Sequence, residues 1–193
     1  MSDLAAVARR EDALLVVVDI QQRLAAAMER RDAVAATTVR LIKTAALVGV
    51  PIVVTRQYPE GLGDTDPTVA HVLDEVEQAG HTLYRADKVA FDCFADPGFA
   101  EIVSASGRKQ LVLAGMETHI CIAQTALHGL RSGLEIQIAA DACCSRDADA
   151  YAAALDRMRA AGAVVSWSES VMYELVGAAG SDEFRSLLRI VKE

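Results

Sequence analysis

A short apolar run gives way to a helical pattern within Gln110-Leu-Val-Leu-Ala-Gly-Met-Glu-Thr-His-Ile-Cys-Ile-Ala-Gln-Thr-Ala-Leu127, where the apolar run ends at Gly115. The pattern predicts a strand, a tight turn and a helix, with Cys121 near the start of the helix. A helix N-terminus carries about half a positive charge and unpaired N–H groups, so it favours the thiolate form of a cysteine placed there. Cys121 is therefore a candidate nucleophile, and the alternative is an inert cysteine buried in the core.

Similar apolar runs recur on both sides of this stretch. They are continuous and rich in β-branched residues, as in Ala13-Leu-Leu-Val-Val-Val18, which is typical of parallel strands buried on both faces. Strands are expected at 13–18, 51–55, 81–85, 111–114, 135–140 and 163–167, helices at 33–48, 96–105, 119–131, 147–160 and from 169 onward, and a weakly periodic segment at 69–79. This alternation predicts an α/β fold, a three-layer α/β/α sandwich whose mostly parallel six-stranded sheet belongs to a single domain over residues 1–193.

The order of the strands decides which side chains meet. In the common order 3-2-1-4-5-6, strands 1 and 4 are neighbours where the order reverses, and ligands bind there at the carboxyl ends of the strands. Asp19 leaves strand 1, Lys88 follows strand 3, and the segment after strand 4 leads to Cys121. A carboxylate, an ammonium and a thiol are therefore expected at one edge of the sheet.

These three groups suit a thiol nucleophile, which needs a charge to stabilise its anion and a group to move its proton. Lys88 can supply the charge and Asp19 can move the proton. Taken alone, a lysine such as Lys88 is more often a solvated surface residue, and Asp19 could equally be a helix cap or turn residue. The segment 56–67 is the longest irregular stretch expected, and we interpret it as a site-forming loop rather than a solvated connector.

Six motifs spread over nearly the whole chain carry a family resemblance. They are Val17-Val-Asp-Ile-Gln-Gln22, Arg56-Gln-Tyr-Pro-Glu-Gly-Leu-Gly63, Lys88-Val-Ala-Phe91, Gly115-Met-Glu-Thr-His-Ile-Cys-Ile-Ala-Gln-Thr-Ala126, Asp141-Ala-Cys-Cys-Ser-Arg146 and Glu169-Ser170. In this order they resemble the isochorismatase-like cysteine hydrolases, a family that includes nicotinamidases. Within that family the chain is most similar to the YcaC-type and isochorismatase domain-containing proteins.

The resemblance implies a reaction and a role for each residue. Cys121 would attack a carbonyl carbon, with Asp19 as proton acceptor and donor and Lys88 positioning both. The backbone N–H groups of Glu117 and Cys121 would form an oxyanion hole, next to a non-proline cis peptide bond between Met116 and Glu117. The implied activity is hydrolysis of a C–N bond in a small amide or carbamoyl substrate through a Cys121 thioester.

Three departures from the family pattern refine this expectation. Nicotinamidases of the family bind a metal through an aspartate and histidines, whereas residues 55–67 contain no histidine, so neither a metal nor another cofactor is expected. Isochorismatases proper cleave an enol ether without this cysteine, so the presence of Cys121 favours acyl chemistry. Asp92 replaces a small polar residue, and we expect its side chain to face away from the thiol.

Further side chains are weaker candidates. Gln57, through its amide, and Phe91, as an apolar wall, are candidates for substrate binding, although either could be ordinary loop or core packing. His119 lies two residues from Cys121, which places the two side chains about 200° apart on a helix, so a Cys–His dyad is not expected. Trp167 is expected at a sheet edge or a subunit interface.

The composition limits the partners. A net charge of −8 argues against nucleic acids and anionic membranes, because either would meet a repulsive field. There is no signal peptide pattern and no apolar run of the roughly 18 residues that a membrane span needs. We expect a cytoplasmic homo-oligomer that acts on a small molecule and keeps its four cysteines reduced.

Two other functions fit the same residues. An enol-ether hydrolase would use Asp19 and Lys88, and Cys121 would take no part in the reaction. Its turnover would therefore survive the change Cys121→Ala. A non-catalytic interaction or thiol-redox protein would hydrolyse nothing, and its Cys121 would have ordinary reactivity.

Overall fold

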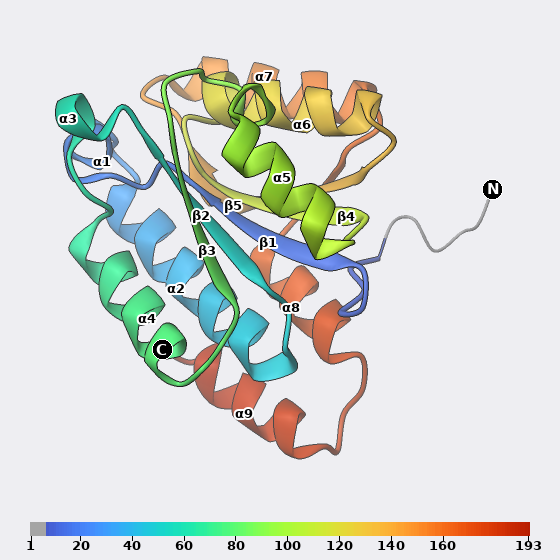
Figure 1. Cartoon of the computed structure of the whole chain (residues 1–193). Helices are drawn as coiled ribbons and strands as arrows, with labels where there is room; N and C mark the ends of the chain where they lie inside the picture. The colour runs from blue at the N-terminus through green and yellow to red at the C-terminus, as the bar shows by residue number, and fades with distance from the viewer. Residues whose placement is uncertain (1–6) are drawn as a thin grey trace.

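The computed structural model describes residues 7–193, and parallel strands form its central sheet in the order β3-β2-β1-β4-β5-β6 (Figure 1). The strands are β1 (Ala13–Val18), β2 (Ile52–Gln57), β3 (Leu83–Lys88), β4 (Gln110–Met116), β5 (Glu135–Cys144) and β6 (Val164–Ser166). The α/β fold and the strand order are thus confirmed. That residues 1–193 form one domain stays a prediction, since residues 1–6 lie outside the described residues.

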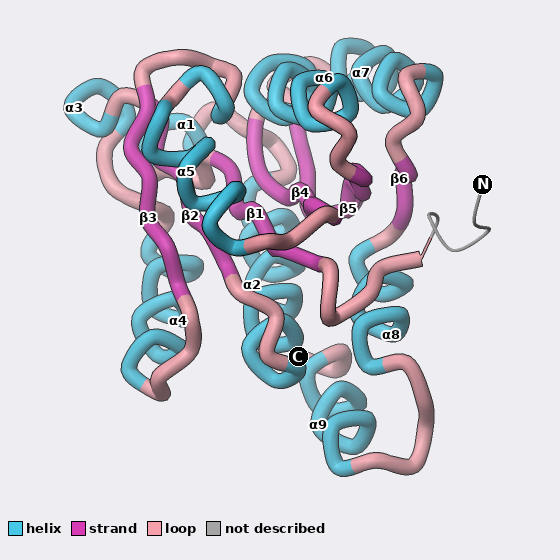
Figure 2. The backbone as a smooth tube through the Cα atoms, turned by 45° about the vertical axis from the view of Figure 1, so that its right-hand side comes forward, coloured by secondary structure: helices cyan, strands magenta, loops and turns pink. Residues whose placement is uncertain are grey.

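Helices cover both faces of the sheet, which confirms the three-layer sandwich (Figures 1 and 2). One layer holds α2 (Arg31–Val48), α4 (Pro67–Gln78), α8 (Ser168–Val176) and α9 (Asp182–Ile190), and the other holds α5 (Pro97–Ser106), α6 (Ala123–Arg131) and α7 (Ala148–Ala160). The short elements are α1 (Gln22–Ala26), α3 (Pro59–Leu62), the 3-10 helix η1 (Cys93–Ala95) and the π-helical turn η2 (Thr118–Ile122). Among residues 7–193, no helix combines the length and the apolarity that crossing a membrane requires.

The continuous apolar pattern of β1 produces two cores. Leu15 and Val17 pack beneath the α2 layer, and Leu14, Val16 and Val18 pack beneath the α5–α7 layer. Every residue of β1 is buried, as expected for a central parallel strand. The same alternation decides on which face of the sheet each functional side chain lies.

Several strands run further than the apolar pattern predicts. β2 and β3 continue to Gln57 and Lys88, because these polar side chains bond to one another at the carboxyl edge of the sheet. The segment 56–67 is correspondingly less irregular than expected, since it contains the end of β2 and all of α3. β5 passes through Asp141 and ends at Cys144, because Ser168 at the start of α8 satisfies the Asp141 carboxylate with its N–H and its hydroxyl.

Gly115 allows β1 and β4 to meet closely at the switch point. Its φ is +131°, and a Cβ added there would lie 1.9 Å from the carbonyl oxygen of Val18. Only glycine fits such a close approach of two backbones. The chain then enters η2 before α6 begins at Ala123, so the predicted helix opens with a π-helical turn that carries Cys121.

Candidate functional site

The predicted functional side chains lie on the α5–α7 side of the sheet. Val53 and Ala86 belong to the core on that side, so Thr55, Gln57 and Lys88 face the same way because side chains alternate along a strand. Asp19 directly follows β1, the neighbour of β2. The sheet thus brings these side chains together at its carboxyl edge, as the sequence predicts.

Lys88 and Asp19 form a buried ion pair. The Nζ of Lys88 lies 2.6 Å from Oδ2 of Asp19, and neither side chain has any exposed surface. Nζ also donates to Oε1 of Gln57 at 2.7 Å and lies near the carbonyl oxygens of Ala90 and Phe91 at 3.3 and 3.4 Å. Burial is the largest single influence and lowers the pKa of this ammonium. The charge of Asp19, the hydrogen bond to it and the nearby thiols Cys93 and Cys121 together outweigh burial, so the pKa is raised and Lys88 stays charged.

Asp19 is fixed from its other side by Thr55. The Thr55 hydroxyl donates to Oδ1 of Asp19 at 2.7 Å, and the Asp19 N–H donates to the Thr55 carbonyl oxygen at 3.2 Å. The φ of Asp19 is 52°, a left-handed conformation that aspartate tolerates better than most residues. Residues held in such conformations cluster at functional sites.

Cys121 lies beside this carboxylate and is 4% exposed. Burial raises the pKa of its thiol, the negative charge of Asp19 and a hydrogen bond to that residue raise it further, and Lys88 partly opposes them. The direction is opposite to the thiolate expected from the helix N-terminus. In the resting site a neutral thiol therefore lies beside the Asp19 carboxylate, a group that can accept the thiol proton.

A second thiol, Cys93, belongs to the same cluster and was not singled out from the sequence. It is fully buried, and its N–H donates to Oγ1 of Thr125 on α6 at 3.0 Å. Burial and the charge of Asp19 raise its pKa to about 12. Within residues 7–193 all four cysteines are free, in agreement with the expected reduced thiols.

The turn that carries the thiol is held by residues of the motif at the end of β5. Arg146 donates to Oε2 of Glu117 from its backbone N at 2.9 Å and from Nε at 3.2 Å. Nδ1 of His119 lies 2.9 Å from Oγ of Ser145, so His119 pairs with Ser145 rather than with Cys121. The Met116–Glu117 peptide bond is cis, as the resemblance implied. The oxyanion-hole role of the Glu117 and Cys121 N–H groups stays a prediction.

The two predicted substrate-binding residues have different surroundings. Gln57 uses its amide within the protein, since Oε1 accepts from Lys88 and Nε2 donates to the Val89 carbonyl oxygen. The side chain of Phe91 is 53% exposed. A wall that contacts substrate is compatible with this exposure, but substrate binding by either residue stays a prediction.

Asp92, expected to face away from the thiol, bonds elsewhere. Its Oδ1 accepts from the N–H of Phe94 at 3.0 Å, and its Oδ2 lies 2.7 Å from Nδ1 of His128, whose ring stacks on Phe94.

Trp167 is 57% exposed beside the edge strand β6, and its role at an interface stays a prediction. Within the described part of the chain, no three His, Cys, Asp or Glu side chains are grouped so that they could hold a metal ion.

Two buried polar residues of the site were not predicted as site residues from the sequence, because no hydrophobic periodicity marks them. Gln21 follows β1 and bonds both backbone groups of Gln57, accepting from its N–H and donating to its carbonyl oxygen. Thr55 lies in a strand that reads as apolar. The pairing of β1 with β2 could have placed Thr55 near Asp19 and Gln57 near Gln21.

Comparison with known proteins gives one family. The family model described as "Isochorismatase domain" matches residues 13–170. Isochorismatase domain-containing protein 2A of Mus musculus is 34% identical over 187 residues, covering 95% of this chain and 84% of the mouse protein. Isochorismatase domain-containing protein 1 of Salmo salar is also 34% identical, over 174 residues that cover 90% of this chain but only 59% of the salmon protein.

Solved structures show the same fold. The MAR1 ribonuclease from Caenorhabditis elegans matches with a TM-score of 0.85 and 28% identity, covering 97% of this chain and 93% of the other. YcaC from Pseudomonas aeruginosa, solved with covalent acrylamide, matches with a TM-score of 0.85 and 25% identity over 95% and 91% of the two chains. The YcaC gene product of Escherichia coli, described as an octameric hydrolase of unknown specificity, matches with a TM-score of 0.83 and 23% identity over 95% and 90%.

Proposed function

Because the chain belongs to the isochorismatase family of hydrolases, we propose that it hydrolyses a C–N bond of a small amide or carbamoyl compound through a thioester on Cys121. One observation carries this proposal. The thiol of Cys121 lies beside Asp19, which acts on its pKa, and the Asp19 carboxylate is in turn paired with the buried ammonium of Lys88. A nucleophile, a proton acceptor and a fixed positive charge are thereby joined in one chain of contacts.

In the proposed reaction the Cys121 sulfur attacks the carbonyl carbon of the amide while its proton passes to Asp19. The C–N bond then breaks, and Asp19 returns the proton to the nitrogen, which leaves as ammonia or an amine. A water molecule gives a proton to Asp19 and attacks the thioester, and that proton returns to the sulfur as the carboxylic acid leaves. The backbone N–H groups of Glu117 and Cys121 donate to the carbonyl oxygen while it carries negative charge.

Lys88 serves this reaction by pairing with the Asp19 carboxylate and fixing its position. Its charge also lowers the pKa of Cys121 against the effect of burial. Both effects require that Lys88 remain protonated, and its raised pKa ensures this over the neutral range.

The relatives support several parts of this proposal. YcaC of P. aeruginosa was solved with covalent acrylamide, an amide that also carries an electrophilic double bond, so acrylamide is a natural probe of Cys121. The E. coli relative is octameric, which supports a homo-oligomer here. The C. elegans protein bears the name of a ribonuclease, but this chain carries a net charge of −8, which opposes RNA binding. The cytoplasmic location stays a prediction.

The test is ammonia release from a panel of small primary amides and carbamoyl compounds by wild type, Cys121→Ala and Cys121→Ser. Loss of a nucleophile from such a unit lowers kcat by roughly 10⁴-fold or more, so both variants should be inactive on any amide that the wild type cleaves. Acid-quenched wild type should carry the acyl group on the Cys121 peptide in mass spectrometry. Turnover that survives Cys121→Ala would instead indicate enol-ether hydrolysis. No turnover together with ordinary thiol reactivity would indicate an interaction or redox protein, and a matched RNA-cleavage assay should be negative.

A further inference from the structure

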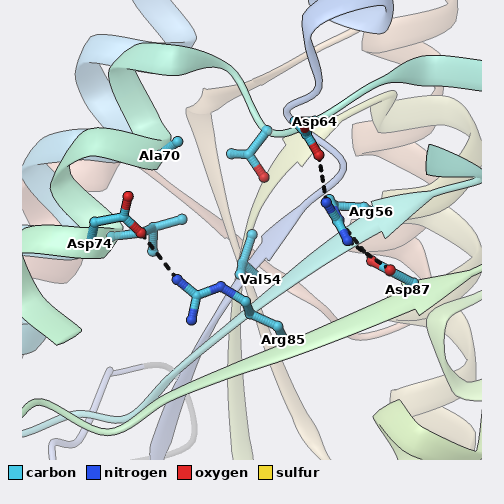
Figure 3. A pocket seen from close by; sticks show the side chains of 9 residues that line it. Val54, Arg56, Asp64, Ala70, Asp74, Arg85 and Asp87 are labelled. Carbon is cyan, nitrogen blue, oxygen red and sulfur yellow. Dashed lines mark hydrogen bonds and ion pairs between the residues drawn. The ribbon is translucent and has the colours of Figure 1, made fainter. Parts of the chain in front are cut away.

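Two of the cavities outside the candidate site each carry two arginine side chains, and they differ in how those charges are balanced. The first, of about 200 Å³, lies between β2, β3 and α4 (Figure 3). There Arg56 lies 2.6 Å from Asp64 and 2.8 Å from Asp87. Arg85 lies 3.3 Å from Asp74 in the same wall. Both guanidinium groups are already neutralised by carboxylates, so this cavity offers no free positive charge.

The second cavity, of about 160 Å³, lies where β5 passes into α7. Its lining includes Arg30 from the start of α2, Arg146 after β5, Tyr151 from α7 and the thiol-bearing Cys144, the last residue of β5. Cys144 is 2% exposed, so it forms a buried part of the wall. The cavity adjoins the turn that carries Cys121, because Arg146 also holds Glu117.

Arg30 is the unbalanced charge in this cavity. Within residues 7–193, no carboxylate oxygen lies within 4.0 Å of its guanidinium, in contrast to Arg56 and Arg85. Tyr151 is a neighbouring group on which the charge of Arg30 acts. The hydroxyl of Tyr151 donates its own hydrogen to the carbonyl oxygen of Ala140 at 2.8 Å. Within residues 7–193 the exposed side chain of Arg30 therefore carries a positive charge that is not paired with a carboxylate.

The charge of Arg30 acts on the cavity wall. Burial raises the pKa of the Cys144 thiol to about 11, and Arg30 is the group that opposes this rise. Arg30 likewise opposes the burial that raises the pKa of Tyr151. Both effects place the positive charge of Arg30 within reach of the cavity wall, where Glu117 acts on Cys144 and Asp141 acts on Tyr151 with the opposite sign.

We propose that this cavity binds a small oxyanion, either inorganic phosphate or a short carboxylate, with Arg30 as its principal ligand and Arg146 as the second. A guanidinium presents a planar fork of donors that matches both kinds of anion. Arg146 uses only its backbone N and Nε for Glu117, and among residues 7–193 no hydrogen bond engages its two Nη groups. The volume of about 160 Å³ equals that of about five waters at 30 Å³ each, which is enough for phosphate or a short carboxylate.

Glu29 also lines the cavity and provides a control variant whose effect on anion binding should be opposite to that of Arg30→Gln. Its negative charge repels an anion, so the change Glu29→Gln should tighten binding. Arg31 is the matched control for Arg30, because it is the next residue of the chain and is paired with Asp32 at 3.3 Å outside the cavity lining. The proposal does not depend on the chemistry of Cys121.

The experiment is isothermal titration calorimetry of the full chain with inorganic phosphate and, separately, with acetate, at constant ionic strength. The wild type should show one saturable site per chain for at least one of these anions. Arg30→Gln should weaken that binding by roughly tenfold or more, the effect typical of losing a charged hydrogen bond. Arg31→Gln should change it by less than about twofold, the range of surface charges outside a site.

The two anions distinguish the sources of the ligand. Tighter binding of phosphate identifies a phosphate site, and tighter binding of acetate identifies a carboxylate site. Absence of saturation for both anions up to about 50 mM, well above the millimolar range of weak specific binding, would overturn the proposal. Equal weakening by Arg30→Gln and Arg31→Gln would also overturn it, since it would show a diffuse surface field in place of a site.

Discussion

The hydroxyl of Thr55 donates to Oδ1 of Asp19 over 2.7 Å, on the opposite side of the carboxylate from Lys88. Two residues further along β2, Gln57 accepts from Lys88 in the same way. Because residues 55 and 57 of a strand point to the same face, β2 holds both members of the ion pair in line. The orientation of the candidate proton acceptor therefore depends on a strand that contributes no reacting group.

Replacement of Thr55 by valine should cost about 1–3 kcal/mol in the free energy of unfolding, because a buried carboxylate oxygen loses its donor. Thr55→Ser keeps the hydroxyl and should retain most of the stability. The matched control is Thr44→Val on α2, where the buried Thr44 hydroxyl has no partner among residues 7–193, so the change should be neutral or stabilising. Urea unfolding of the three variants checks this. Equal losses for Thr55→Val and Thr44→Val would contradict the role of the Thr55 bond.

Lys88→Met should destabilise the protein by about 3–5 kcal/mol, because it leaves the charge of Asp19 buried without its partner. The double change Lys88→Met with Asp19→Asn removes that charge and should recover part of the loss. Thermal or urea unfolding of the single and double variants measures the coupling between the two residues. Additive losses in the double variant would mean that the ion pair does not govern the stability of this edge.

The pH dependence of Cys121 alkylation should reveal the two charges that flank the thiol. Burial and Asp19 raise its pKa and Lys88 lowers it, so the thiol is protonated near pH 7.5 and alkylation should still be rising above pH 9. Asp19→Asn removes a negative charge, lowers the pKa of Cys121 and should speed alkylation at pH 8. Lys88→Met removes a positive charge, raises that pKa further and should slow alkylation.

Acrylamide labelling followed by peptide mass spectrometry measures these rates for each cysteine. Cys93 provides an internal control, because it is fully buried and should stay unmodified as long as the variants remain folded. Shifts of the same sign in both variants would contradict the arrangement of charges. Under the proposed function, Asp19→Asn should still abolish turnover, because the proton acceptor is lost even though the thiol ionises more easily.

The fold and the meeting of Asp19, Lys88 and Cys121 could be predicted because they follow from the order of parallel strands. The hydrogen-bond partners of these residues could not. Thr55 bonds to Asp19, and Gln21 bonds to Gln57, in each case across 36 positions of sequence. A polar contact between residues so far apart produces no periodic pattern in the sequence. The influence of burial and of Asp19 on the pKa of Cys121 could not be predicted for a related reason, since the helix N-terminus is visible in the sequence while burial beside a carboxylate is not.

Asp141 shows how one distant partner can mislead a sequence-based boundary. A charged residue indicates the end of a buried strand, yet β5 continues for three residues, to Cys144, because Ser168 supplies two donors to the Asp141 carboxylate. This contact also satisfies an N–H at the start of α8, as a capping side chain does. The Asp141-to-Arg146 motif thus ties β5 to α8 at one end and holds the Cys121 turn at the other.

Asp141→Ala should therefore cost about 1–3 kcal/mol in the free energy of unfolding, since it leaves the buried Ser168 hydroxyl and an N–H of α8 without their acceptor. Ser168→Ala removes the hydroxyl but keeps the N–H contact, so its cost should be smaller. Hydrogen exchange of α8 in both variants locates the effect. Faster exchange confined to α8 and β5 is the expected result, and uniform acceleration throughout the chain would contradict a local tie.

Gly115→Ala should be the most damaging small substitution in the sheet. The added Cβ would lie 1.9 Å from the Val18 carbonyl oxygen, a contact between backbones that no rotamer can relieve, so the loss should exceed about 3 kcal/mol. Gly49→Ala is the control, because Gly49 also has a positive φ of +74° but nothing lies within 4 Å of its added Cβ. Its cost should be the conformational strain alone, about 1–2 kcal/mol. The soluble yield and the unfolding midpoint of the two variants measure the difference. Similar losses of stability would show that β1 and β4 can separate at the switch point without a cost in stability.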